Sequence, residues 1–257
     1  MSFDRSRLPG RISVRRGPQA GFSENFFSLI RARDITGDYF ALADQDDIWL
    51  PDKLERALEA LETIPAGVPA LYCSRTVLVD SRNREFGLSP LFRREPGFRN
   101  ALVQTLGGGN TMVFNASARE LFLAVGERLR VPFHDWFLYL AISACGGTVV
   151  YDPRPSLRYR QHGTNLMGRN RGVAARWSRL RMILDGRYRS WVDQNLRALK
   201  LFREQIRPEH CQLLDDFAQW RSAPLMERIR GLYRSRLYRQ GRVETLALLL
   251  SVALRRI

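Results

Sequence analysis

The chain has 257 residues, of which 45% are hydrophobic and 26% are charged, and its net charge is +15. This length suffices for one substantial core, with or without a smaller appendage. Basic nucleic-acid-binding proteins carry a recognisable reading motif or basic residues interleaved with stacking aromatics. The sequence has neither feature, so we expect no nucleic acid among its partners.

The positive charge is concentrated in the last third of the chain. Residues 1–168 carry 21 Lys and Arg against 18 Asp and Glu, a net charge of +3, whereas residues 169–257 carry 20 against 8, a net charge of +12. We therefore predict a nearly neutral α/β domain over 1–168 and a basic, amphipathic helical region over 169–257. Within the second part, apolar residues at helical spacing predict helices over 190–206, 209–221, 224–239 and 242–256.

The composition also bears on the compartment. Cys73, Cys145 and Cys211 are widely spaced and form no C-x-x-C pair, which indicates free thiols in a reducing compartment. Residues 1–10 lack the apolar core of a signal peptide, and no stretch approaches the ~20 apolar residues of a membrane span. We therefore expect a cytoplasmic protein. Two interpretations stay open for 169–257: a solvated bundle packed on the α/β domain, or peripheral attachment to the anionic surface of the inner membrane.

Two short elements are expected near the N-terminus. Ile12 and Val14 indicate a short strand, and Ser23 is a candidate cap for a helix that extends to Ile30. These elements lead to the most distinctive segment of the sequence.

That segment is an acidic loop between a strand and a helix. Tyr39–Ala43 is an apolar run rich in aromatics, which indicates a buried strand, and Asp44, Asp46 and Asp47 follow at its carboxyl end. Pro51 then favours the start of a helix. Three carboxylates in four residues repel one another unless a cation lies among them, and Mg2+ or Mn2+ with oxygen ligands fits that charge. The alternative is an acidic cluster that faces water and is favoured by the helix dipole.

A glycine loop, Gly107 to Asn110, separates further predicted elements. A strand over 70–80 and a short helix over 99–106 precede it, and a strand over 111–114 follows, after which Asn115 is expected to cap a helix. Glycines let the backbone approach a ligand closely and leave N–H groups free for hydrogen bonding. A flexible turn without a ligand is the alternative interpretation.

A second polar cluster, His134-Asp135-Trp136, opens a predicted apolar helix. Asp135 lies in the first turn, and Gly146 is expected to end the helix. A carboxylate in this place is favoured by the helix dipole alone, so Asp135 could be there without any catalytic role. Extended segments over 149–151 and 157–160 then lead into Tyr159–Asn165.

These segments resemble family 2 glycosyltransferases with the GT-A fold, in particular a rhamnosyltransferase-like branch that builds bacterial surface polysaccharides. The resemblance covers about residues 11–168 and is carried by Asp44–Leu54, Gly107–Asn110, Val131–Ala141 and Tyr159–Asn165. It implies an α/β fold with a Rossmann-like mixed sheet of the GT-A type, followed by the basic helical region. It also implies inverting transfer of a rhamnose-like sugar from a nucleotide-diphosphate donor to a saccharide or lipid-linked acceptor.

The resemblance assigns roles to individual residues. It implies Asp135 as the general base for the acceptor hydroxyl. Ligation of Mg2+ or Mn2+ is implied for Asp44, Asp46 and His162. Donor binding is implied for Asp47, Gly108, Gly109, Asn110 and Arg160. A position on the acceptor side is implied for His134, Trp136 and Trp49.

One part of the family pattern is missing from this sequence. Members normally carry another strand–helix–strand unit before the acidic loop, with two short motifs that grip the base and the ribose. This sequence starts where the third strand is expected, so we expect an N-terminally truncated sheet that binds nucleotide sugars weakly. The alternative function is that of a catalytically deficient remnant that acts as a binding or interaction protein.

Overall fold

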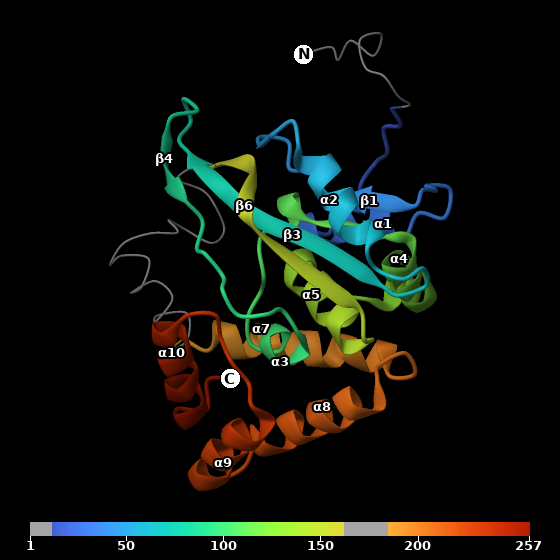
Figure 1. The fold of residues 1–257 in the computed structure, drawn as a ribbon. Coiled ribbons are helices and arrows are strands. Elements are labelled where there is room, and N and C mark those ends of the chain that lie inside the picture. Colours follow the sequence, from blue (N-terminus) through green and yellow to red (C-terminus); the bar gives the residue numbers. More distant parts are fainter. Residues whose placement is uncertain (1–11, 162–184) are drawn as a thin grey trace.

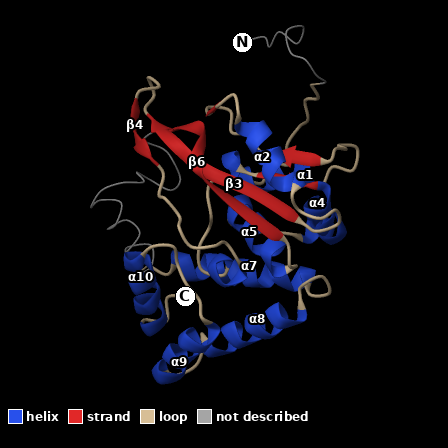
Figure 2. Ribbon diagram, viewed as in Figure 1, coloured by secondary structure: helices blue, strands red, loops and turns tan. Residues whose placement is uncertain are grey.

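The computed structural model describes residues 12–161 and 185–257, and it shows a sheet with helices on both faces and a further group of helices (Figure 1 and Figure 2). The N-terminal elements are α1 Phe22–Ile30, β1 Tyr39–Ala41, β2 Ile48–Trp49, α2 Lys53–Glu62, β3 Ala70–Val79, β4 Glu85–Leu88, α3 Phe98–Ala101, β5 Val113–Asn115, α4 Ala116–Val125, α5 His134–Ala144 and β6 Thr148–Arg160. The C-terminal elements are α7 Arg187–Leu199, α8 Pro208–Trp220, α9 Leu225–Ser235 and α10 Arg242–Ala253. None of the helices in these two ranges is both long enough and apolar enough to cross a membrane.

The sheet is mixed, and the predicted α/β class is confirmed. Its strand order is β1-β5-β3-β6-β2, with β4 beside β3 outside this path. β3 runs parallel to β6, whereas the other four strand pairs among the described residues are antiparallel. β3 is therefore the central strand, and its pairing with β6 extends from Ala70 to Val79.

β3 separates two apolar layers because its side chains alternate between the faces of the sheet. Ala70 and Tyr72 pack with Ala57 of α2 on one face. Leu71 and Cys73 belong to a larger cluster on the other face, together with side chains of α1, α4 and α5. Figure 2 shows α2 and α5 on opposite sides of the sheet.

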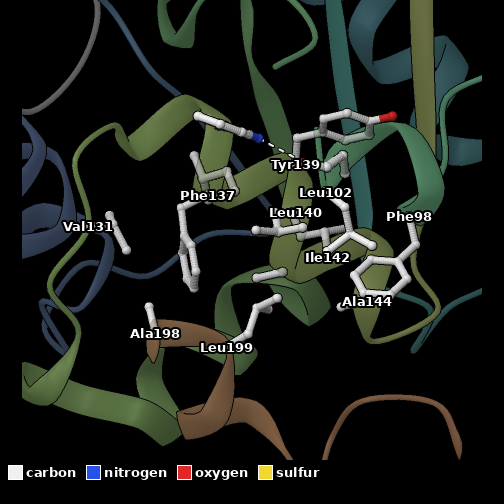
Figure 3. Close-up of a cluster of buried hydrophobic side chains, with 14 of the residues drawn as sticks. Phe98, Leu102, Val131, Phe137, Tyr139, Leu140, Ile142, Ala144, Ala198 and Leu199 are labelled. Carbon is white, nitrogen blue, oxygen red and sulfur yellow. Dashed lines mark hydrogen bonds between the residues drawn. The ribbon is translucent and has the colours of Figure 1, made fainter. Parts of the chain in front are cut away.

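Helix α5 lies at the centre of the larger cluster. Its residues from Trp136 to Ala144 are each at most 5% exposed, and a helix that is apolar on all sides requires such complete cover. Figure 3 shows Leu140 of α5, Phe98 of α3 and Leu199 of α7 within one cluster. Side chains from both predicted parts of the chain therefore share one core. The predicted boundary at residue 168 lies outside the described residues.

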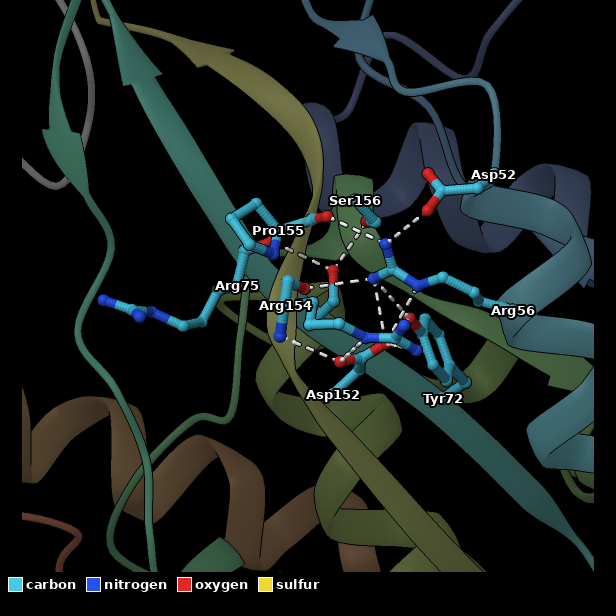
Figure 4. A network of polar contacts seen from close by, with 9 residues as sticks. Asp52, Arg56, Tyr72, Arg75, Asp152, Arg154, Pro155 and Ser156 are labelled. Atoms are coloured by element: carbon cyan, nitrogen blue, oxygen red, sulfur yellow. Dashed lines mark hydrogen bonds and ion pairs between the residues drawn. The ribbon is translucent and has the colours of Figure 1, made fainter.

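A buried guanidinium group fixes α2 to the sheet (Figure 4). Arg56 donates to the carboxylates of Asp152 at 3.0 Å and Asp52 at 2.9 Å, and to the hydroxyl oxygen of Tyr72 at 3.3 Å. It also donates to two carbonyl oxygens of β6 at 3.1 Å each. Tyr72 in turn donates to Asp152 at 3.0 Å. Because each buried polar group has a partner, the network holds α2, the helix that follows the acidic loop and β2.

Two strand predictions need correction at the N-terminal side. The described residues 12–18 form no strand, and Val14 is 77% exposed, so this segment buries too little apolar surface to pair with the sheet. β1 was expected to be a buried strand, but Tyr39 and Phe40 are only half-buried and Ala41 is exposed. Its place at an edge of the described sheet explains the difference.

The C-terminal strand prediction was incomplete. The two extended segments expected over 149–151 and 157–160 form the single strand β6. Its pairing with β3 shifts register between Ser74 and Val77, opposite Pro153 and Pro155. A bulge accommodates proline because residues there donate no ladder hydrogen bond.

Candidate active site

Four carboxylates from two distant segments lie close together. Asp44, Asp46 and Asp47 belong to the loop between β1 and β2, and Asp135 lies in the first turn of α5. Burial, together with the negative charges of Asp47, Asp46 and Asp135, raises the pKa of Asp44 to about 6. The fold therefore gathers the predicted acidic loop and the predicted base into one negatively charged site.

Asp47 ties three segments of the site together. One carboxylate oxygen accepts a hydrogen bond from the side-chain amide of Asn110, and the other accepts the backbone N–H of Arg160 at 3.0 Å. Burial raises the pKa of Asp47, while these two hydrogen bonds oppose the rise. Both oxygens are thus engaged in holding the acidic loop against the glycine loop and the end of β6.

Lys53 completes this arrangement, and sequence reasoning missed it. Its fully buried ammonium group donates to the carbonyl oxygen of Asn110 at 2.8 Å and lies 4.0 Å from the ring centroid of Trp49. Burial lowers the pKa of Lys53 to about 8, against the opposing charge of Asp47. One face of Trp49 is therefore covered by a cation. Only two of the 41 basic residues are lysine, and this rarity could have drawn attention to Lys53 beside the acidic loop.

His134 packs the glycine loop against α5. It is 6% exposed, and its ring stacks on Phe26 with 4.0 Å between centroids. A Cβ atom on Gly109 would lie only 2.2 Å from Nε2 of His134, so this position requires glycine. Burial lowers the pKa of His134, and among the described residues neither ring nitrogen has a hydrogen-bond partner. The imidazole is therefore neutral at pH 7, and its predicted acceptor contact stays a prediction.

The other residues of the glycine loop have local roles in the turn. Gly107 has a φ of +75°, which favours glycine. Gly108 is extended, and a Cβ atom there would lie 2.7 Å from the side-chain oxygen of Asn110. Small residues thus let Asn110 reach Asp47. A direct contact of Gly108 or Gly109 with a donor stays a prediction.

Asp135 and Trp136 point to different environments although they are neighbours. Asp135 is half-buried, and its Oδ1 accepts the backbone N–H of Trp136 at 2.7 Å. The indole N–H of Trp136 donates to the carbonyl oxygen of Ala101 at 2.7 Å, and the ring stacks on Tyr188 at 6.0 Å. The fold therefore brings Asp135 to the acidic site but places the side chain of Trp136 in the core.

Arg160 supports the backbone of the site. Its Nε donates to the carbonyl oxygen of Asp46 at 3.0 Å, and its Nη1 donates to those of Asp80 and Ser81 at 3.2 Å each. The guanidinium thus joins the acidic loop to the end of β3. Its predicted contact with a diphosphate stays a prediction.

Tyr159 is a second residue that sequence reasoning did not assign to the site. Burial raises the pKa of its phenol to about 12, with further contributions from the charges of Asp47, Asp44, Asp46 and Asp135. The phenol therefore keeps its proton beside all four carboxylates. Tyr159 directly precedes Arg160 in a segment that resembles the glycosyltransferase family, and this position could have indicated that it belongs to the site.

The carboxylates of the acidic loop are the type of ligand that a hard divalent cation prefers. Burial and then repulsion from the neighbouring carboxylates raise the pKa of Asp44, and oxygen ligands of this kind favour Mg2+ or Mn2+. Within residues 12–161 and 185–257, no group of three or more His, Cys, Asp or Glu side chains is arranged to hold a metal ion. His162, the third predicted ligand, lies outside the described residues.

Comparisons with known proteins define the class. A family profile described as Glycosyl transferase family 2 matches residues 4–122, which contain the acidic loop and the glycine loop. Residues 4–122 therefore match glycosyl transferase family 2, and the family inferred from the motifs is confirmed for that part of the chain.

A particular relative is the dTDP-rhamnosyl transferase RfbG of Shigella flexneri. It is 30% identical to this chain over 190 residues, which are 70% of this chain and 62% of the relative. The match thus spans less than two thirds of that protein's length.

Proposed function

We propose that this chain is an inverting glycosyltransferase that moves a rhamnose-like sugar from a nucleotide-diphosphate donor to a saccharide or lipid-linked acceptor. The observation that carries the proposal is the position of Asp135 beside Asp44, Asp46 and Asp47. This arrangement puts a candidate base next to a candidate cation site, which suits transfer from a diphosphate donor. The name of the Shigella flexneri relative supports dTDP-rhamnose as the donor, and synthesis of a bacterial surface polysaccharide is the proposed setting.

Asp135 is the proposed general base. Its Oδ1 is held by the N–H of Trp136, so the other carboxylate oxygen takes the proton of the acceptor hydroxyl. The acceptor oxygen attacks the anomeric carbon as the bond between that carbon and the diphosphate oxygen breaks. The bonding electrons leave with the nucleoside diphosphate, and the configuration at the anomeric carbon inverts. A positioned base of this kind contributes roughly 10²- to 10⁴-fold to the rate.

Asp44 and Asp46 would hold Mg2+ or Mn2+, with His162 as a further ligand. When bound there, the cation would neutralise charge on the leaving diphosphate. Asp47, Asn110 and Lys53 keep the acidic loop in place, and the protonated phenol of Tyr159 offers a hydrogen-bond donor to the same region.

Product analysis with nucleotide sugars tests the proposal. The unmodified chain, supplied with dTDP-rhamnose, a divalent cation and lipid-linked or saccharide acceptors, should release dTDP and form a product of inverted configuration by NMR. Asp135→Asn should lower kcat by at least about 10²-fold with donor affinity nearly unchanged. Asp216→Asn, an exposed carboxylate of α8, is the matched control and should be fully active.

Two outcomes would contradict the assignment. A product of retained configuration would exclude a single inverting displacement, and normal turnover of Asp135→Asn would exclude Asp135 as the base. Tight donor binding without any turnover in the unmodified chain would instead support the alternative of a catalytically deficient binding protein.

A further inference from the structure

Helix α10 is apolar on two opposite faces. One face is buried, with Leu248 at 1% and Val252 at 0% exposure. The opposite face leaves four large apolar side chains in water at 46–66% exposure: Val243, Leu246, Leu250 and Leu254. The first three recur at i, i+3 and i+7, and the fourth follows at the helix end, so they form one stripe. A helix that is hydrophobic all round is normally covered on all sides.

Helix α9 also has exposed apolar side chains. It packs on α10 through Arg228, which donates to the carbonyl oxygens of Val252 and Ala253 at 2.9 Å each. Figure 1 shows the two helices at the end of the molecule opposite to α2. α9 exposes Met226 by 60% and Tyr233 by 76%. Such a concentration of exposed apolar groups marks an interaction site in a folded protein.

The charge around these helices is strongly positive. Residues 221–257 contain nine arginines and two glutamates, a net charge of +7. One of the glutamates, Glu244, accepts the backbone N–H of Gly241 and so caps α10. Among the arginines whose exposure the structure describes, five are exposed: Arg230, Arg234, Arg236, Arg255 and Arg256.

We propose that the α9–α10 surface, defined as the exposed side chains of these two helices, binds an anionic lipid bilayer. α10 lies parallel to the membrane with Val243, Leu246, Leu250 and Leu254 in the boundary between headgroups and acyl chains. The arginines of α9 and of the chain after α10 bind lipid phosphates. The 12 residues of α10 are too few to span a bilayer, but an apolar stripe flanked by cations is typical of a helix at a membrane interface.

Charge complementarity favours a lipid surface over a second copy of the chain. Two copies joined through this surface would bring two segments of net charge +7 together, and their repulsion opposes association. Anionic headgroups attract the same residues. Insertion of the apolar stripe goes beyond attachment by charge, and it does not depend on the proposed sugar transfer.

Vesicle flotation of the full chain tests the apolar stripe. The unmodified protein should bind vesicles of phosphatidylcholine with phosphatidylglycerol more tightly than vesicles of phosphatidylcholine alone. Leu246→Gln/Leu250→Gln should weaken binding to the anionic vesicles about tenfold or more, because two apolar side chains no longer leave water. The matched control is Leu29→Gln/Leu54→Gln, which changes two exposed leucines of α1 and α2 and should bind normally.

A charge variant separates the two contributions. Arg230→Gln/Arg234→Gln should weaken binding by a smaller factor and reduce its dependence on salt, whereas the leucine variant should keep that salt dependence. Should the first leucine pair lower the melting temperature, Val243→Gln/Leu254→Gln tests the same stripe.

Two results would overturn the inference. One is equal vesicle binding by the unmodified chain and both stripe variants. The other is a dimer in analytical ultracentrifugation that becomes a monomer in Leu246→Gln/Leu250→Gln, which would identify a second copy as the occupant.

Discussion

The acidic loop and the start of α5 bring carboxylates to the same place, but the protein holds them there by different means. The loop between β1 and β2 depends on polar contacts from distant segments: Asn110 and Arg160 bind Asp47, and Arg56 anchors the helix that follows. Asp135 instead stands at the end of a helix that is buried on all sides. One half of the site is therefore fixed by specific hydrogen bonds and the other by apolar packing.

This difference predicts which changes affect chemistry and which affect folding. Loss of a carboxylate of the loop should act mainly on the site itself, whereas loss of the buried partner Arg56 should also cost stability. Loss of apolar packing around α5 should lower the stability of the whole core, because that cluster joins the sheet to the C-terminal helices. Four variants test the contrast, in order of decreasing expected effect.

Asp46→Asn should affect activity far more than folding. If Asp46 helps to hold the cation, its loss removes several kcal/mol of transition-state stabilisation, roughly 10²-fold or more in turnover. Its melting temperature should stay close to that of the unmodified chain, since the side chain is half-buried in a loop. Steady-state kinetics at low and high Mg2+ measure the effect. Near-normal turnover at low Mg2+ would remove Asp46 from the metal site.

Phe137→Ala should give the largest loss of stability. The ring is fully buried in the cluster around α5 and lies 5.6 Å from Phe202 between centroids, so its removal leaves a cavity that costs about 3–5 kcal/mol. Urea unfolding measures the change, with Phe86→Ala as the control because Phe86 is 49% exposed. A loss below about 1 kcal/mol would mean that the packing around α5 is loose.

Arg56→Met should cost about 3 kcal/mol, because it leaves Asp152 buried without its main cationic partner. Arg154→Met is a matched control: Arg154 also pairs with Asp152, but its side chain is 69% exposed. That pair should contribute at most about 1 kcal/mol. Addition of Asp152→Asn to Arg56→Met should restore part of the loss in urea unfolding. Equal effects of the two arginine variants would show that burial does not determine the strength of this network.

Asp44 should make stability depend on pH by about 1–2 kcal/mol, after allowance for its partial exposure. Its pKa of about 6 lies above the ordinary value of an aspartate. The folded state therefore holds more protons than the unfolded state between about pH 4 and pH 6, and stability falls as pH rises through this window. Thermal melting in a chelating buffer should show the fall in the unmodified chain but less of it in Asp44→Asn.

A divalent cation provides the companion measurement. Mg2+ at pH 7 should raise the melting temperature of the unmodified chain more than that of Asp44→Asn, because it relieves the repulsion among the carboxylates. Parallel curves for the two proteins, with and without Mg2+, would contradict the proposed role of Asp44.

Local patterns in the sequence were sufficient for most of the helices and for the central strand. The predicted helix over 209–221 is α8, Pro208–Trp220, and the strand expected over 70–80 is β3. Of the two predicted caps, Asn115 is confirmed, since it accepts the backbone N–H of Ala118 at 2.9 Å. The cap predicted at Ser23 is wrong, because Ser23 lies inside α1, whose N-cap is Gly21. The confirmed features depend on neighbours within a few residues, which periodicity and capping preferences describe.

Features that depend on distant contacts could not be read in the same way. Arg56 of α2 donates to Asp152 of β6, and Lys53 donates to the carbonyl oxygen of Asn110. Neither contact produces a periodic pattern in the sequence. The burial of Trp136 away from the site likewise follows from the packing of α5 against α3 and α7. The motifs identified which carboxylates gather at the site, whereas the side chains that hold them required the structure.

The bulge in β6 determines which face of the sheet each later side chain of that strand points to. Ser74 pairs with Asp152 and Val77 with Arg158, so β6 uses six residues where β3 uses three. β6 therefore has three extra residues over this stretch. Because three is an odd number, each later side chain of β6 points to the face opposite to the one that simple alternation would give. Tyr159 and Arg160 reach the acidic loop in this shifted phase. A strand shortened by one residue between Asp152 and Arg158 would present them to the opposite faces, so the spacing around the two prolines specifies the site as much as the residues within it.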